Sequence, residues 1–227
     1  MRKFLIPFML VFLMVLPAVS SAKKTGKIVD DSLYVDNLLG IQVTAAHGWK
    51  IKVFREKKKK RNIQRAVIVK KNFKINSLVR ELHGDYTIPT VTIFADSTNM
   101  TIEQYGDMIL DQLYKVNSDN EILLNTELLS ETDFIDSITV KVNGLDSKRI
   151  QFKHRYKRFL DTSGRDVNWE RNGGVQLMQD FNIIDLAIFK KGDWVILLYA
   201  VCEREFYQLN KRAIEYMLGS LKVVNNP

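Results

Sequence analysis

The stretch Ile138-Thr-Val-Lys-Val-Asn-Gly-Leu-Asp-Ser-Lys-Arg-Ile-Gln-Phe152 places an Asn-Gly pair after the apolar residues Ile138, Val140 and Val142 and before Ile150 and Phe152. The pair Asn143-Gly144 favours the type I′ turn, which joins two antiparallel strands through residues of positive φ. The apolar residues on each side are two positions apart, which is typical of half-buried strands. This stretch therefore predicts a β-hairpin, and with it an antiparallel sheet.

A second hairpin is predicted where residues 181–189 meet residues 194–201 across Lys190-Lys-Gly-Asp193. Upstream, the alternation in residues 49–54 directs Trp49, Ile51 and Val53 to a core and leaves Lys50 and Lys52 in solvent. Gly48 ends a turn before this strand, because glycine tolerates positive φ. The other predicted strands are 39–44, 63–70 and 85–96.

Two helices are predicted among these strands. In residues 101–116, Thr101 and Gln104 form a capping box, and apolar residues recur at steps of three and four. In residues 206–221 the apolar stripe consists of Phe206, Leu209, Ala213, Met217 and Leu221, widened by Ile214 and Tyr216. The fold class expected is α+β, with an antiparallel β-sheet sandwiched by helices.

The N-terminal residues 1–22 have the order of a secretory signal peptide. Arg2 and Lys3 precede a short apolar run, and small residues follow up to Ala22. Cleavage is expected after Ala22, with cleavage after Ser20 as the alternative, and export would be to the periplasm or the extracellular space. Residues 23–32 are polar and predicted to be a flexible linker, and residues 33–227 are predicted to form a single domain.

The single cysteine, Cys202, excludes an internal disulfide. It ends the apolar run of residues 194–201, and we expect it to be a small buried core residue rather than a reactive thiol. The three histidines, His47, His83 and His154, are far apart in the sequence and have no cysteine partner. No metal site and no cofactor is therefore predicted.

The positive charge of the chain is concentrated in residues 50–74, which carry twelve Lys and Arg against one acid, a net charge of +11. Subtracting this +11 and the +2 of residues 1–22 from the total of +8 leaves −5 for the remainder. This distribution argues against a uniformly basic nucleic-acid binder and indicates a localised basic patch. The predicted anion-binding or partner-binding residues are Lys57, Lys58, Lys59, Lys60 and Arg61.

Three kinds of partner fit this basic run: an acidic protein, an anionic lipid surface or an acidic polysaccharide. The alternative is a hydrated loop tip that binds nothing. Residues 152–159 interleave aromatic residues with cations, as a single-stranded nucleic-acid platform would, but the same pattern fits a strand. We favour the strand, because export makes nucleic acid a poor ligand.

Catalytic chemistry has little support in the sequence. No Gly-x-Ser-x-Gly motif and no glycine-rich phosphate loop is present. The acid pairs Asp133 with Asp136 and Glu203 with Glu205 could serve a hydrolase that uses carboxylates in a cleft, which is the alternative function. The expectation is a protein that is not an enzyme.

Several short motifs occur in a familiar order: Tyr34, Gly40-Ile-Gln-Val43, Gly48-Trp49-Lys-Ile51, the hairpins, and the final Leu218-Gly-Ser-Leu-Lys-Val-Val224. Across residues 33–224 this order resembles the PsbP-like proteins, which include extrinsic photosystem II subunits and exported bacterial relatives. The family usually has a proline before Gly-Trp, where this chain has Ala45-Ala46-His47.

The resemblance implies a helix-sandwiched antiparallel sheet that acts as a binding or assembly module, with Trp49 as a core anchor and no catalytic residues to assign. The function expected is that of an exported, non-enzymatic envelope protein that docks on an acidic partner through its basic loop. The sequence leaves the oligomeric state open.

Overall fold

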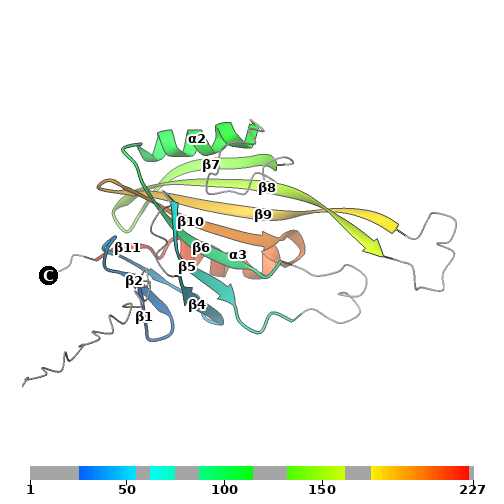
Figure 1. Cartoon of the computed structure of the whole chain (residues 1–227), viewed down its shortest axis with the longest axis horizontal. Coiled ribbons are helices and arrows are strands. Elements are labelled where there is room, and N and C mark those ends of the chain that lie inside the picture. The colour runs from blue at the N-terminus through cyan, green and yellow to red at the C-terminus, as the bar shows by residue number, and fades with distance from the viewer. Residues whose placement is uncertain (1–25, 55–61, 75–86, 115–131, 162–174, 225–227) are drawn as a thin grey trace, which may run out of the picture.

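The computed structural model describes residues 26–54, 62–74, 87–114, 132–161 and 175–224, which form two antiparallel sheets and two helices (Figure 1). The large sheet has the strand order β4 (Trp49–Val53), β5 (Asn62–Lys70), β6 (Thr90–Ser97), β10 (Trp194–Glu203), β9 (Val175–Lys191), β8 (Leu145–Asp161) and β7 (Thr132–Val142). The small sheet has the order β1 (Lys27–Val29), β2 (Leu33–Asp36), β3 (Ile41–Thr44) and β11 (Lys222–Val223). The helices are α2 (Ile102–Tyr114) and α3 (Arg204–Leu218).

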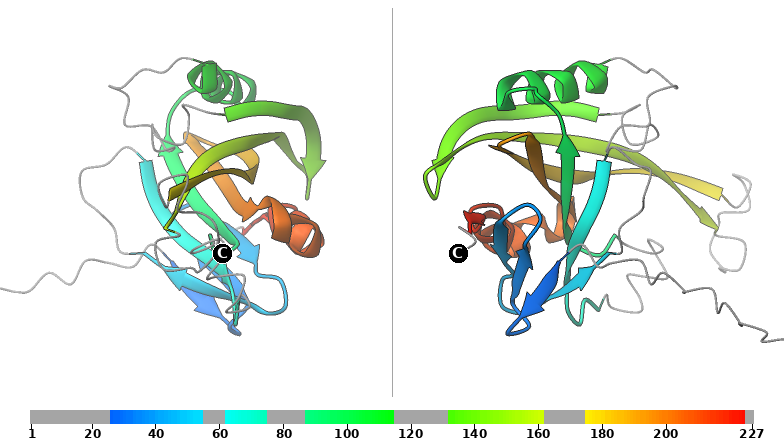
Figure 2. Two further views of the ribbon diagram at one scale, coloured as in Figure 1. Left: turned by 90° about the vertical axis from the view of Figure 1, so that its right-hand side faces the viewer. Right: turned by 60° about the vertical axis from the view of Figure 1, so that its left-hand side comes forward.

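The large sheet lies between the two helices, as Figure 2 shows. On one face, Ile102, Tyr105 and Ile109 of α2 pack on apolar residues of β8, β9 and β10. On the other face, α3 and the small sheet share a larger core with the large sheet, and Tyr34 and Ile214 are buried in it. The predicted α+β sandwich is therefore confirmed, with the small sheet as an additional part of one layer.

Both predicted hairpins are present. Asn143 and Gly144 have φ values of 50° and 83°, and Val142 pairs directly with Leu145, which is the geometry of a two-residue turn with positive φ. In the second hairpin Lys191 pairs with Trp194, and Gly192 has a φ of 55°. Both turns therefore set the register of the long strands that follow them.

The predicted capping box of α2 is also confirmed. The Thr101 side-chain hydroxyl accepts a hydrogen bond from the Gln104 amide at 3.2 Å, and the Gln104 side-chain oxygen accepts one from the Thr101 amide at 3.0 Å. These bonds satisfy two backbone groups at the start of the helix, which would otherwise lack intrahelical partners.

The small sheet corrects one prediction. Residues 23–32 are predicted to be a flexible linker, but Lys27–Val29 form β1 and pair with β2. The turn that ends at Gly48 leads from β3 in the small sheet to β4 in the large one. The partner of β3 on its other side is β11, from the far end of the chain, through the pair Gln42 and Lys222.

The predicted apolar stripe of α3 is wrong in part. Leu209 is 84% exposed and Tyr216 is 54% exposed, although both were assigned to the buried face. The buried face instead consists of Tyr207, Asn210, Ile214, Met217 and Leu218. The helix is rotated from the predicted orientation because the Tyr207 hydroxyl donates a hydrogen bond to the buried Asp185 of β9.

Five single-residue expectations are confirmed. Trp49 and Ile51 are buried while Lys50 and Lys52 are exposed, as the alternation in β4 predicts. Cys202 is a fully buried residue of the core.

The interleaved segment 152–159 lies within the strand β8, as favoured from the sequence. In this strand Phe152 and His154 are buried, whereas Lys153 between them is half-buried. Residues 1–25, which include the predicted signal peptide, lie outside the described part of the chain.

Candidate binding site at the cationic sheet edge

The strand β4 lies at one edge of the large sheet and pairs with β5, its only strand partner in the described chain. Trp49 and Ile51 anchor it in the core, with 2% and 3% of their surface exposed. Lys50 and Lys52 lie on the opposite side of the strand and are exposed. Lysines on an edge strand discourage another strand from pairing with its free backbone groups, so this edge stays open to solvent.

The predicted site residues Lys57, Lys58, Lys59, Lys60 and Arg61 lie outside the described residues. Their position in the chain is nevertheless informative, since they connect two strands that pair antiparallel up to Val53 and Ala66. The sequence assigned the run to a connection between these two strands, and both strands are present as predicted.

More cations lie at the other end of β5. Lys71 and Lys74 are exposed, and the Lys71 amide donates a hydrogen bond to the Gly48 carbonyl at 2.8 Å. Lys70 is half-buried, with its ammonium 5.5 Å from the centre of the Trp49 ring. We call the exposed lysines Lys50, Lys52 and Lys71 the cationic edge.

Arg65 belongs to the same basic stretch of sequence, but the structure removes it from the surface. The register of β5 against β6 shifts between Gln64 and Ala66, so that Arg65 is the extra residue of a β-bulge. A bulge re-aims the side chain of its extra residue. Both Arg65 and Ala66 are therefore buried, and the surface charge of this region is smaller than the sequence suggests.

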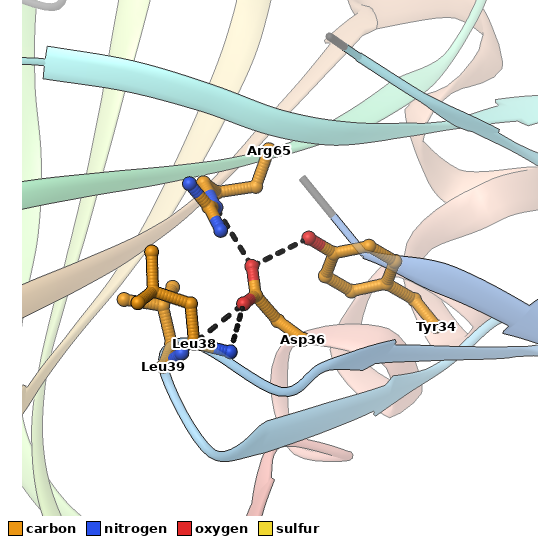
Figure 3. Close-up of polar contacts among 5 residues, drawn as sticks. All are labelled: Tyr34, Asp36, Leu38, Leu39 and Arg65. Carbon is orange, nitrogen blue, oxygen red and sulfur yellow. Dashed lines mark hydrogen bonds and ion pairs between the residues drawn. The ribbon is translucent and has the colours of Figure 1, made fainter. Parts of the chain in front are cut away.

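The Arg65 side chain is bound to Asp36 at the end of β2 (Figure 3). One Asp36 carboxylate oxygen accepts hydrogen bonds from Arg65 Nε at 2.7 Å and from the Tyr34 hydroxyl at 2.8 Å. The other oxygen accepts from the backbone amides of Leu38 and Leu39, both at 3.1 Å. The cluster joins the small sheet to the large one.

Burial alone would lower the pKa of Arg65, but the hydrogen bond and the negative charge of Asp36 raise the pKa above its usual value, so the guanidinium stays charged. The four bonds to Asp36 match the roughly four acceptor positions that a carboxylate offers. Asp36 therefore has no position left for abstracting a proton from a substrate. The cluster stabilises the fold that presents the cationic edge.

A second polar cluster fixes the start of α3 on the large sheet. The Tyr207 hydroxyl donates to one oxygen of Asp185 at 2.8 Å, and the Gln151 amide group donates to the other at 2.6 Å. Burial and the neighbouring Asp185 charge raise the pKa of Tyr207. The phenol therefore stays protonated and continues to donate, which is a structural role.

Cys202 has the chemistry of a core residue. Burial raises the pKa of its thiol to about 12, and the negative charges of Glu203 and Asp185 add to the effect. Since the thiolate is the nucleophile, a thiol with such a pKa is unreactive at neutral pH.

Of the two acid pairs named for the alternative hydrolase, the structure describes both side chains only for Glu203 and Glu205. Glu203 is fully buried and accepts a hydrogen bond from the Thr87 amide, whereas Glu205 is exposed. Asp136 is exposed, and the side chain of Asp133 lies outside the described part. The described residues also contain no group of three or more His, Cys, Asp or Glu that could hold a metal ion.

No protein-family model and no curated protein sequence matches the chain. Among solved structures, CyanoP, the cyanobacterial PsbP of Synechocystis sp. PCC 6803, is similar with a TM-score of 0.50 and 10% identity, over 87% of this chain and 96% of CyanoP. LpqN, involved in cell envelope biogenesis of Mycobacterium tuberculosis, has a TM-score of 0.44 and 10% identity, over 89% of this chain and 90% of LpqN.

The match to CyanoP shows that the chain has a PsbP-like fold, which confirms the fold implied by the sequence resemblance. At this level of identity the similarity concerns the fold alone. Within the residues that the structure describes, no helix has the length and apolar character required to cross a membrane.

Proposed function

We propose that this chain is an exported, non-enzymatic binding module that docks on an acidic partner through the cationic edge and the adjoining run Lys57, Lys58, Lys59, Lys60 and Arg61. The observation that carries the proposal is the edge strand β4, whose apolar side chains are anchored in the core while Lys50 and Lys52 are exposed. A rigid strand fixes the backbone positions of these two lysines, so little backbone freedom is lost on binding.

Export is supported by the order of residues 1–22 and by the fold shared with CyanoP. The PsbP-like fold is compatible with a binding or assembly role. The alternative hydrolase gains no support from its named carboxylates, since Glu203 is buried and hydrogen-bonded while Asp136 and Glu205 are exposed.

The test measures retention of the purified protein on immobilised envelope extract as a function of salt concentration. Three variants are compared with the unmodified chain: Lys50→Gln with Lys52→Gln, the five-residue run changed to Gln, and the control Lys141→Gln with Lys211→Gln. The control removes two exposed cations from β7 and α3. Because screening weakens exposed charge interactions, retention should fall as salt rises.

The proposal expects both edge variants to be retained more weakly than the control and to show a shallower dependence on salt. Treating the extract with protease, with a polysaccharide-degrading enzyme or with a lipid-extracting solvent then identifies the acidic partner by class. Equal retention of all four proteins at low salt would refute the proposal.

A further inference from the structure

The two longest strands of the large sheet extend beyond all their described neighbours. The strands β8 and β9 each have 17 residues and pair from Ser147 with Phe189 to Asp161 with Val175. However, β7 accompanies β8 only as far as His154, and β10 accompanies β9 only as far as Asn182. The next seven pairs, from Arg155 with Phe181 onward, form a two-stranded ribbon alone among the described strands.

We call this ribbon, residues 155–161 paired with 175–181, the β-arm. Seven residues at roughly 3.3 Å each carry it about 20 Å past the rest of the sheet, and Figure 1 shows it projecting from the body. A two-stranded ribbon without further strands or a helix is only marginally stable in water. The β-arm would therefore gain stability from a surface that packs against it.

The root of the β-arm is cationic. Two cations lie over the ring of the half-buried Phe181. Lys153 Nζ is 5.2 Å from the ring centre, and the guanidinium carbon of Arg204, in the first turn of α3, is 5.3 Å from it. Arg204 is exposed. The root is held on the body, because Tyr207 in the first turns of α3 is bonded to Asp185 of β9.

The sequence of the β-arm continues this charge outward. Residues 155–161 read Arg-Tyr-Lys-Arg-Phe-Leu-Asp, three cations against one acid, interleaved with two aromatic residues and a leucine. Residues 175–181 add a second acid, Asp180, so the β-arm has a net charge of +1. Cations with long apolar stems and amphipathic aromatic residues are the types that reside at the level of lipid headgroups. An anionic lipid surface offers a partner to both kinds of residue: phosphates to the cations, and the acyl boundary to the aromatic residues and the leucine.

We infer that the β-arm docks on an anionic lipid surface, with Arg155, Lys157 and Arg158 supplying the charge. The inference goes beyond the proposed function, because these residues are separate from the cationic edge. It needs no lipid-binding cavity, since a projecting ribbon can reach a planar surface while the body stays outside it.

The experiment measures co-sedimentation of the protein with two kinds of vesicle: phosphatidylglycerol mixed with phosphatidylcholine, and phosphatidylcholine alone. The protein is purified from the cells that produce it, and its N-terminal residue is determined before use. The first variant replaces Arg155, Lys157 and Arg158 with Gln. Its matched control replaces Lys141, Lys211 and Lys222 with Gln, which removes the same number of cations from exposed positions elsewhere. A cation near an anionic bilayer contributes enough that losing three should weaken partitioning on the order of 100-fold.

A second variant removes the β-arm while keeping the strand register. Because Arg155 pairs with Phe181, deleting residues 156–180 and joining these two through Asn-Gly recreates a two-residue hairpin. Its urea unfolding transition shows whether the rest of the domain is folded. If it is not, the conclusion is drawn from the Gln variant, which keeps every residue of the β-arm backbone.

We expect the unmodified chain and the control to bind the vesicles that contain phosphatidylglycerol and not those of phosphatidylcholine alone. Both β-arm variants should lose this binding. Equal binding by the Gln variant and its control, or no binding of the unmodified chain at low salt, would overturn it. Loss of retention on protein-only extract, with vesicle binding unchanged, would assign the β-arm to an acidic protein and also overturn it. The variants of the cationic edge keep the β-arm unchanged, and the β-arm variants keep the cationic edge unchanged. The vesicle experiment can therefore fail while the proposed function holds, and the reverse.

Discussion

Replacing Asp36 with Asn should destabilise the protein by about 3–5 kcal/mol, the cost of removing one partner from a buried ion pair. The Asp36 and Arg65 side chains have no exposed surface, and their closest atoms are 2.7 Å apart. Asn has nearly the same volume but no charge. Its NH2 group would replace an oxygen that accepts hydrogen bonds, and would therefore face N–H or O–H donors with a donor of its own. Arg65 would be left as a buried cation without its counter-charge.

Chemical denaturation with urea, followed by circular dichroism, measures this loss as a lower midpoint at an unchanged dependence on denaturant concentration. For a chain of this size, a loss of about 4 kcal/mol corresponds to a Tm lower by roughly 8–16 °C. The matched control is Glu215→Gln, which breaks the exposed pair of Glu215 with Lys211, 3.8 Å apart. That change should cost no more than about 0.5 kcal/mol.

A double variant separates the loss of the pair from the cost of stranding one charge. In Asp36→Asn with Arg65→Met no buried cation remains, and the apolar chain occupies the space of the guanidinium. The double variant should recover about half of the stability lost in the single one or more. A loss below about 1 kcal/mol in Asp36→Asn, or a double variant as unstable as the single, would refute the assignment of Asp36 and Arg65 as a buried ion pair that joins the two sheets.

Three further predictions follow from single residues. Alkylation of Cys202 in the folded protein at pH 8 should be slower than in urea by at least about 1000-fold, since a pKa raised from 9.0 to about 12 lowers the thiolate fraction by that factor; comparable rates would contradict the burial of the thiol. Asn143→Ala should cost about 1–2 kcal/mol in urea unfolding, because it strains a residue of positive φ and removes two hydrogen bonds to carbonyls after α3; Asn143→Gly should cost less, and the reverse order would count against the turn geometry. Leu209→Glu should change stability by less than about 0.5 kcal/mol, while Met217→Ala should cost about 2–5 kcal/mol; a large loss in Leu209→Glu would restore the apolar stripe predicted from the sequence.

Much of the fold is encoded in local sequence. Asn143-Gly144 specifies its hairpin because few other pairs adopt positive φ at two successive positions. Thr101 and Gln104 specify the start of α2 because each side chain bonds the backbone of the other residue. The alternation of Trp49 and Ile51 with lysines specifies which side of β4 is buried, because side chains along a strand point to opposite faces.

The candidate site depends on both levels. The sequence located the basic run and the outward lysines of β4, and it counted Arg65 in the charge of the basic region without a prediction of its burial. A bulge in β5 and the distant Asp36 place Arg65 in the core instead. The nearest sequence signal is Arg65 itself, a lone cation beside the β-branched run of residues 66–69.

What the sequence determined by itself are the features set by neighbouring residues: turns, a helix cap, strand alternation and the concentration of charge. The tertiary structure alone decided the pairing of β3 with β11, the rotation of α3 toward Asp185 and the extension of the β-arm past its neighbours. These features depend on contacts between segments far apart in the chain. Which distant segments meet is fixed by packing and by the need of buried polar groups for partners, and a local pattern carries no record of either.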